Sequence, residues 1–339
     1  MSVSIVEANV ERDLEMMQAT LNANRTRQAT IDRFRWLYLS NPDGRARAWL
    51  AVDDKTGETA GFTAVFPRRI RPAGTSAPVM AWNCGDFSIH QKYRAGGVAV
   101  KLRRAAREGV DRGDSPFLYA HPNDRMLPVH MRVGHKTLAQ MVRYGKVLRA
   151  NTGIEAVDGF SSAVLRFAGL DVVAGRGADV ELVSSWPSTV ELDALDDRTR
   201  GRMGTALVRD GAYLSWRFQQ NPFEPVELLR ARRKGLLTGY LTFVVKGGHC
   251  SVKDWIGENA ADRDALFACL LAELRRRAVT RVSVIALETH PDLPRLRQFG
   301  FSKRPDASTA VVYAAETYAA KAAVLDPSAW YMTVGDRDV

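Results

Sequence analysis

The stretch Asp86-Phe-Ser-Ile-His-Gln-Lys-Tyr-Arg-Ala-Gly-Gly-Val-Ala99 decides the fold of this chain. Residues 82–89 are rich in apolar and β-prone types, which predicts a strand. Gly96 and Gly97 give the backbone the freedom for a tight turn. From residue 98 to about 112, apolar residues recur at helical spacing with Arg and Lys between them, which predicts a helix. Strand, turn and helix together direct backbone N–H groups and the positive end of a helix dipole at one point, where a phosphate would bind.

The segment from Arg94 to Ala99 resembles the Arg/Gln-x-x-Gly-x-Gly/Ala signature of the GNAT superfamily of acyl-CoA-dependent N-acyltransferases. In that family the amides of this loop hold the pyrophosphate of coenzyme A. A plain strand-to-helix turn without a ligand is the alternative for so short a motif. A second family signature, Asn-x6-Tyr-x3-Gly-Phe, is similar to the pattern of Asn123, His130, Gly134 and His135, with two departures. His130 replaces the tyrosine that often serves as general acid, and His135 replaces the phenylalanine.

Length and composition restrict the protein class. A chain of 339 residues favours two domains, and its 46% apolar and 25% charged residues are ordinary for a globular protein. We expect no membrane span, because no apolar run approaches ~20 residues, and no signal peptide, because the N-terminus lacks the basic and apolar regions of one. Three scattered cysteines predict neither disulfides nor a metal site. We therefore expect a cytoplasmic protein.

The formal charge of +10 favours anionic partners. Coenzyme A, a sugar nucleotide and nucleic acid are all anionic, so the charge alone does not distinguish among them. Much of this charge is arginine spread along predicted helices, which is also typical of a solvated helix face.

The first half follows the GNAT order of elements. Strands are expected at 4–8, 49–52, 61–67, 79–89, 116–120 and 137–148, and helices at 12–29, 98–112 and 123–131. The second half repeats it. Trp36-Leu-Tyr-Leu-Ser-Asn-Pro42 aligns with Trp216-Arg-Phe-Gln-Gln-Asn-Pro222, Gly61-Phe with Gly239-Tyr, Asp86-Phe with Asp254-Trp, and Gly134-His with Gly300-Phe.

We therefore predict an α/β (α+β) fold with two tandem GNAT-like domains, each a mixed, mostly antiparallel sheet flanked by helices. The N-terminal domain would cover residues 1–148, a connecting segment 149–190, and the C-terminal domain 191–339. The second copy has Glu258, Asp262 and Asp264 where the first has its glycines, so we expect only the first to bind acyl-CoA. The second would shape or close the acceptor pocket.

The resemblance implies the site residues. The thioester carbonyl would meet a backbone N–H on the strand at 87–89. Asp86 is a candidate base, or else a structural hydrogen-bond acceptor. His130 is a candidate acid or base, or else a surface histidine, and His121 is a third candidate. The residues expected to bind acetyl-CoA or another acyl-CoA are Phe87, Ser88, Ile89, Arg94, Ala95, Gly96, Gly97, Val98, Ala99 and Asn123.

The predicted function is an N-acyltransferase, specifically an acetyltransferase, that acts on the amine of a small acceptor. The tail at 326–338 resembles tails of GNAT-like proteins from bacterial polysaccharide gene clusters, which points to an amino sugar or sugar nucleotide. Two alternatives stay open: a Fem-type aminoacyl transferase, and a non-catalytic GNAT-derived sensor or nucleic-acid-binding module. The intact loop argues for coenzyme A, so we do not expect nucleic acid as a partner. We expect a monomer or a dimer.

Overall fold

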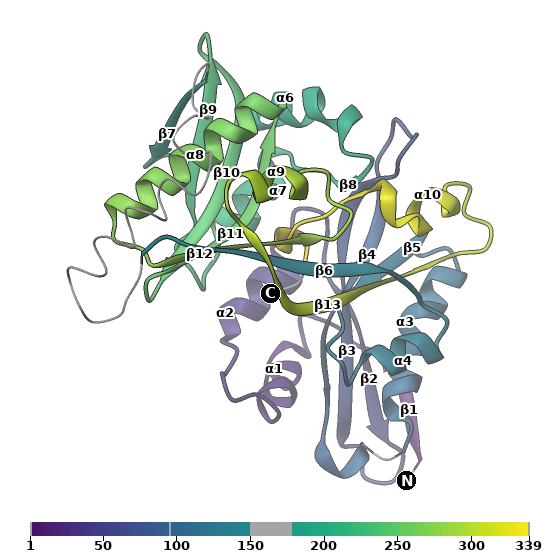
Figure 1. Ribbon diagram of the computed structural model, residues 1–339. Coiled ribbons are helices and arrows are strands. Elements are labelled where there is room, and N and C mark those ends of the chain that lie inside the picture. Colours follow the sequence, from purple (N-terminus) through teal and green to yellow (C-terminus); the bar gives the residue numbers. More distant parts are fainter. Residues whose placement is uncertain (1, 95, 150–177, 338–339) are drawn as a thin grey trace.

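A computed structural model describes residues 2–94, 96–149 and 178–337. It is a mixed, mostly antiparallel sheet flanked by helices (Figure 1), which confirms the predicted fold class. The strands are β1 (Val3–Glu7), β2 (Arg47–Asp53), β3 (Thr59–Arg71), β4 (Val79–Ile89), β5 (Phe117–Ala120), β6 (Lys136–Val147), β7 (Asp179–Val183), β8 (Thr205–Leu207), β9 (Glu227–Arg233), β10 (Leu236–Lys246), β11 (His249–Gly257), β12 (Arg281–Leu287), β13 (Ser302–Ala314) and β14 (Trp330–Tyr331). The helices are α1 (Leu14–Asn22), α2 (Ile31–Phe34), α3 (Val98–Asp111), α4 (Leu127–Arg132), α6 (Thr189–Thr199), α7 (Gly211–Leu214), α8 (Ala260–Arg276), α9 (Leu293–Gln298) and α10 (Lys321–Leu325).

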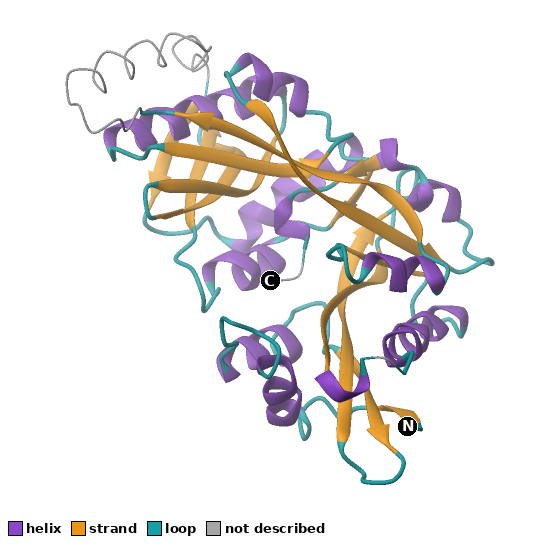
Figure 2. Ribbon diagram, turned by 60° about the horizontal axis from the view of Figure 1, so that its bottom comes forward, coloured by secondary structure: helices purple, strands orange, loops and turns teal. Residues whose placement is uncertain are grey.

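One long path of paired strands joins the two halves of the chain. Its order is β1-β2-β3-β4-β5-β13-β6-β12-β11-β10-β9-β7. The last long strand of the second half, β13, lies between β5 and β6, and β6 in turn pairs with β12. These two strands cross the middle of the molecule (Figure 2). The predicted boundary near residue 148 therefore follows a strand that is paired on both sides by the second half.

Helices cover both faces of the first-half strands. α3 places Leu102, Ala106 and Val110 in a buried cluster with Trp82 of β4, as its apolar spacing predicts. α1 and α2 lie on the other side of β2 and β3 (Figure 1). Among the described residues, no helix is both long and apolar enough to cross a bilayer.

Helix α1 and the expected connecting segment differ from the sequence prediction. α1 ends at Asn22 rather than near residue 29, because Asn22 exchanges hydrogen bonds with the backbone of Ala29 and folds the intervening residues into a loop (Nδ2 to O 2.9 Å, N to Oδ1 2.7 Å). Part of the expected connecting segment forms β7, which pairs with β9. Residues 150–177 of that segment lie outside the described residues.

The sequence repeat has a structural counterpart. α2 and α7 each continue directly into a π-helical turn, Arg35–Leu39 in the first half and Ser215–Gln219 in the second. The aromatic residues of these turns, Trp36, Tyr38, Trp216 and Phe218, are buried in one hydrophobic cluster. β4 and β11 also share a bulge at matching positions, next to Asp86 and Asp254 respectively.

Candidate functional site

The strands β4 and β5 separate beyond a short paired segment. They run parallel and pair from Trp82–Leu118 to Cys84–Ala120, where β5 ends and β4 continues to Ile89. At the separation, β4 bulges so that Gly85 and Asp86 lie opposite Ala64 alone. We call the space beside β4 beyond Cys84 the first fork.

Two backbone N–H groups of β4 point into the first fork. His90 donates its N–H to the Ala60 carbonyl at 2.8 Å, which fixes the alternation of hydrogen bonds between β3 and β4. Ser88 therefore directs its N–H toward β3, whereas Phe87 and Ile89 direct theirs away from it. Of the three strand residues expected near a thioester carbonyl, Phe87 and Ile89 thus carry the available donors.

The glycine loop leads into an uncapped helix. Gly97 has a left-handed φ of 68°, and α3 begins at the next residue, Val98, with no side-chain hydrogen bond at its N-terminus. A Cβ on Gly97 would meet no atom within 4 Å, and one on Gly96 would make only ordinary van der Waals contact, at 3.8 Å from Val98, so the loop is open at Gly97. Ala95 lies outside the described residues. Exposed Lys101 and Arg104 in the first two turns of α3 add positive charge.

Asp86 is buried in a cluster of cations. Arg33 donates to both carboxylate oxygens, with one contact at 2.9 Å, and Arg25 donates to Oδ1 at 3.1 Å. Tyr38 donates its hydroxyl to Oδ2 at 3.2 Å, and burial together with this carboxylate raises the pKa of Tyr38. Both carboxylate oxygens are therefore engaged, which favours the structural alternative for Asp86 over the catalytic one.

The candidate histidines are also buried. His130 of α4 contacts His135 edge to face with ring centroids 4.5 Å apart, and burial, with nearby Arg103, lowers the pKa of both. His121, just after β5, has Nε2 3.2 Å from the Met332 sulfur, and burial holds its pKa well below the ordinary value. All three are neutral imidazoles at neutral pH. His130 is not the surface histidine that the sequence left as one alternative.

Asn123 begins the turn before α4. Its side-chain oxygen and its carbonyl both accept the Met126 N–H, at 3.1 and 2.9 Å. Helix α4 begins at Leu127, four residues later than predicted, so Asn123 lies in the turn that precedes the helix.

A cavity of about 600 Å³ is formed mainly by the loop between α1 and α2. It is lined by residues 24–30, Arg33, Phe223 and Glu224. Asn24 connects the cavity wall to the first fork, since its Nδ2 donates to Ser88 Oγ at 2.7 Å and to the Ile89 carbonyl at 3.1 Å. The same side chain accepts from Arg94 of the glycine loop. The cavity, β4 and the loop are therefore joined through one residue.

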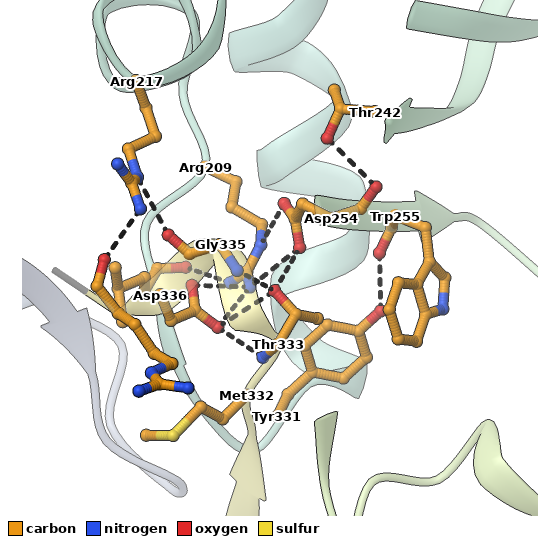
Figure 3. A network of polar contacts seen from close by, with 12 residues as sticks. Arg209, Arg217, Thr242, Asp254, Trp255, Tyr331, Met332, Thr333, Gly335 and Asp336 are labelled. Atoms are coloured by element: carbon orange, nitrogen blue, oxygen red, sulfur yellow. Dashed lines mark hydrogen bonds and ion pairs between the residues drawn. The ribbon is translucent and has the colours of Figure 1, made fainter. Parts of the chain in front are cut away.

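The equivalent fork of the second half is crossed by the C-terminal tail. β11 and β12 pair only from His249–Arg281 to Val252–Val284. Beyond that point, Leu287 of β12 donates its N–H to the Met332 carbonyl at 3.0 Å, and Tyr331 donates its hydroxyl to the Trp255 carbonyl of β11 at 2.7 Å. The tail is fixed further by Arg209, which pairs with both Asp254 and Asp336 (Figure 3).

The start of α8 also differs from that of α3. Asn259 caps it by accepting the Asp262 N–H at 3.0 Å, so an amide side chain and not an acid provides the cap. The acidic residues predicted to repel a pyrophosphate are each paired with an arginine: Glu258 with Arg198, Asp262 with Arg233, and Asp264 with Arg295. Cavities of about 260 and 270 Å³ flank this helix start.

Comparison with solved structures gives the fold. A protein of Enterococcus faecalis V583 described as a probable N-acyltransferase superposes with a TM-score of 0.68, at 13% identity over 93% of this chain and 73% of that one. A GCN5-related N-acetyltransferase from Anabaena variabilis superposes with a TM-score of 0.67, at 12% identity over 91% of this chain and 72% of that one. A GCN5-related N-acetyltransferase from Kribbella flavida superposes with a TM-score of 0.66, at 14% identity over 92% of this chain and 71% of that one. The chain has the GNAT fold. The sequence matches no protein-family model and no curated protein.

Sequence reasoning missed three features of this GNAT-fold site. Asn24 lies in a loop that was expected to be helical, and the tail residues cross the second fork from a distant part of the sequence. Arg103 is buried in α3, although its neighbours in sequence suggested a solvated basic face. Its spacing to Ala106 and Val110 was the available signal, because i, i+3 and i+7 lie on one helix face.

Proposed function

We propose that this protein is an acyl-CoA-dependent N-acyltransferase whose first fork binds the acyl donor. One observation carries the proposal: the open glycine loop and the uncapped start of α3 adjoin a fork with outward N–H groups, while the equivalent second fork is crossed by the tail. Uncapped amides at a helix start are suited to a diphosphate. Acetyl is the simplest acyl group for this reaction.

The residues at the first fork have separate roles in this proposal. The amides from Gly96 to Ala99 would hold the pyrophosphate, and the N–H groups of Phe87 and Ile89 would polarise the thioester carbonyl. Holding amine and thioester together supplies most of the remaining acceleration. The roles of Asp86, His130 and His121 stay predictions, and their burial favours structural functions for all three.

The cavity formed by the loop between α1 and α2 is the proposed acceptor site. Two lining arginines, Arg25 and Arg33, share the single carboxylate of Asp86. The lining residue Glu224 is already paired with Lys253 at 2.7 Å. With Arg27, the lining of the cavity therefore carries excess positive charge. This charge is suited to an acceptor that bears phosphate as well as an amine, such as the amino sugar of a sugar nucleotide. Through Phe223 and Glu224, which line this cavity, the second half of the chain would also contact the acceptor.

The division into two GNAT-like domains is also a proposal. It is supported by the paired π-helical turns and by the two forks, each next to a bulge on the corresponding strand. In this view the halves exchange their last strands, β6 and β13, across the centre of the sheet.

Calorimetric titration with acetyl-CoA tests the donor site. The Cβ of Gly96→Val would meet no atom nearer than 3.8 Å, and we expect this variant to weaken binding about 10-fold or more by displacing the loop amides. Ala261→Val, in the exposed first turn of α8, is the matched control and should bind like wild type. Equal affinity in all three proteins, or a loss confined to Ala261→Val, would overturn the proposal.

A thiol-release assay tests the reaction. Acetyl-CoA is supplied with a panel of simple amines, amino sugars and nucleotide-linked amino sugars. We expect turnover with amines, highest for acceptors that carry phosphate, and a selective rise in the KM of those acceptors in Arg27→Gln. Absence of turnover across the panel, with coenzyme A bound, would favour the sensor alternative.

A further inference from the structure

Arg103 lies where β4 and β5 separate. It belongs to the second turn of α3, is only 3% exposed, and donates from Nη2 to the Gly85 carbonyl at 3.0 Å. Gly85 is the first residue of β4 beyond the last pair with β5. The guanidinium also lies 5.3 Å from the ring of Phe87, one of the two residues that direct an N–H into the first fork.

The buried charge of Arg103 has no anion beside it among the described residues. Its Nε and Nη1 are inaccessible to solvent and have no hydrogen-bond partner there. The groups that face it from α4 and the start of β6 are His130 and His135, both neutral, and each has an unpartnered ring nitrogen of its own. One turn further along α3, Arg107 pairs with Asp111 at 3.0 Å.

A buried guanidinium is costly unless an anion and hydrogen-bond acceptors compensate it. The two unpartnered donors of Arg103, Nε and Nη1, would therefore gain their hydrogen bonds when a negatively charged group binds beside them. The place of Arg103 in the fold indicates which negatively charged group this would be. With a diphosphate at the glycine loop, the pantetheine arm would run into the first fork, and its sulfur end would reach the place where the strands meet.

We propose that Arg103 stabilises the thiolate of coenzyme A as it leaves; this rests on the proposed function. The acceptor nitrogen forms a bond to the acyl carbon, and the carbon–sulfur bond breaks with its electron pair going to sulfur. The proton lost from nitrogen passes to solvent through the acceptor cavity. Arg103 keeps its own protons and pairs with the thiolate by a charge-assisted hydrogen bond.

This role also explains the departures from the second GNAT signature. His130 stands where relatives often carry a tyrosine that protonates the sulfur, yet as a buried neutral imidazole it is a poor acid. A permanent cation removes the need for that proton, because the product can leave as a thiolate. Arg103 would thus be a catalytic residue in place of the missing phenol.

Binding of coenzyme A in the absence of an acceptor tests this assignment. Titrations of coenzyme A and of its S-methyl thioether are run near neutral pH in two buffers of different ionisation enthalpy, which reports protons released on binding. Free thiols are mostly protonated there, so we expect wild type to release protons with coenzyme A only. We also expect about 10-fold tighter binding of coenzyme A than of the thioether.

Arg103→Met should lose both the proton release and the preference for coenzyme A, while its affinity for acetyl-CoA stays within about 2-fold of wild type. Arg103→Lys should retain part of the proton release, and it also serves if the methionine variant does not fold. Arg112→Met, at the exposed far end of α3 from the glycine loop, is the control and should behave as wild type.

Three results would overturn the assignment. The first is binding of coenzyme A by wild type without release of protons, which would leave the proposed function intact. Arg103→Met could weaken acetyl-CoA and the thioether equally, which would indicate a structural role. Tighter, Arg103-dependent binding of succinyl-CoA than of acetyl-CoA would assign the arginine to an acyl carboxylate. Failure of wild type to bind coenzyme A at all would instead overturn the proposed function itself.

Discussion

The indole rings of Trp36 and Trp216 stack with centroids 4.7 Å apart, and each donates its Nε1–H to the main-chain carbonyl of the other, at 3.0 and 3.1 Å. These residues occupy the same place in the two π-helical turns. Exchange of identical bonds between repeated positions is the geometry of an approximate two-fold axis. The pair therefore fixes the relative positions of the two turns, next to the proposed acceptor cavity that Phe223 borders.

Replacing one indole should test this relationship. Trp216→Phe keeps an aromatic ring but removes the donated hydrogen bond and leaves the Trp36 carbonyl unsatisfied, so we expect a loss of about 1–3 kcal/mol in the free energy of unfolding. Trp36→Phe should cost a similar amount. In the double variant the losses should not add, because each single change already breaks the shared arrangement. Additive losses in urea denaturation would show that the two residues act independently.

The variant Asp86→Asn should distinguish a structural role of Asp86 from a catalytic one. It removes the charge that Arg25 and Arg33 share, and loss of one partner of a buried ion pair costs about 3–5 kcal/mol. We therefore expect a large loss of stability, measured by urea denaturation. A variant with near-wild-type stability and no thiol release would instead identify Asp86 as the general base.

Local elements could be predicted from the sequence because their signals are local. β4 has the bounds expected from its apolar run, and α3 follows the turn at Gly97. The exchange of β6 and β13 could not be predicted, since either half would accept its own last strand with the same side-chain pattern. The cations around Asp86 could not be predicted from the sequence either, because Arg25 lies in a loop and Arg33 in a short helix that are both far from Asp86 along the chain.

Arg209→Met should destabilise the tail network. Arg209 is the cation between Asp254 and Asp336, and it is 1% exposed (Figure 3). Without it two carboxylates remain buried side by side, so we expect a loss of about 3–5 kcal/mol near neutral pH. Arg209→Met combined with Asp336→Asn removes one of these charges and should recover part of the loss. If the double variant is no more stable than the single one in urea denaturation, charge burial is not the cause.

Buried histidines should make the protein sensitive to mild acid. Burial lowers the pKa of His121 and His130 and brings those of His135 and His290 to about 3. Between pH 3 and about 6.5 the unfolded chain binds protons at these positions and the folded chain does not, so stability falls as the pH falls. Each group contributes about 1.4 kcal/mol per pH unit, and the four together about 5.

One group acts in the opposite direction. Burial raises the pKa of Asp336 to about 6, so the folded state holds a proton that the unfolded state has lost, and stability from this residue rises toward lower pH. Because four histidines oppose one aspartate, we expect a net loss of stability from pH 6.5 to 5.5 in urea denaturation. His135→Phe, which restores the residue of the GNAT signature, should reduce the pH dependence by about one proton. A flat profile in wild type, or an unchanged slope in this variant, would contradict the assignment of neutral buried imidazoles.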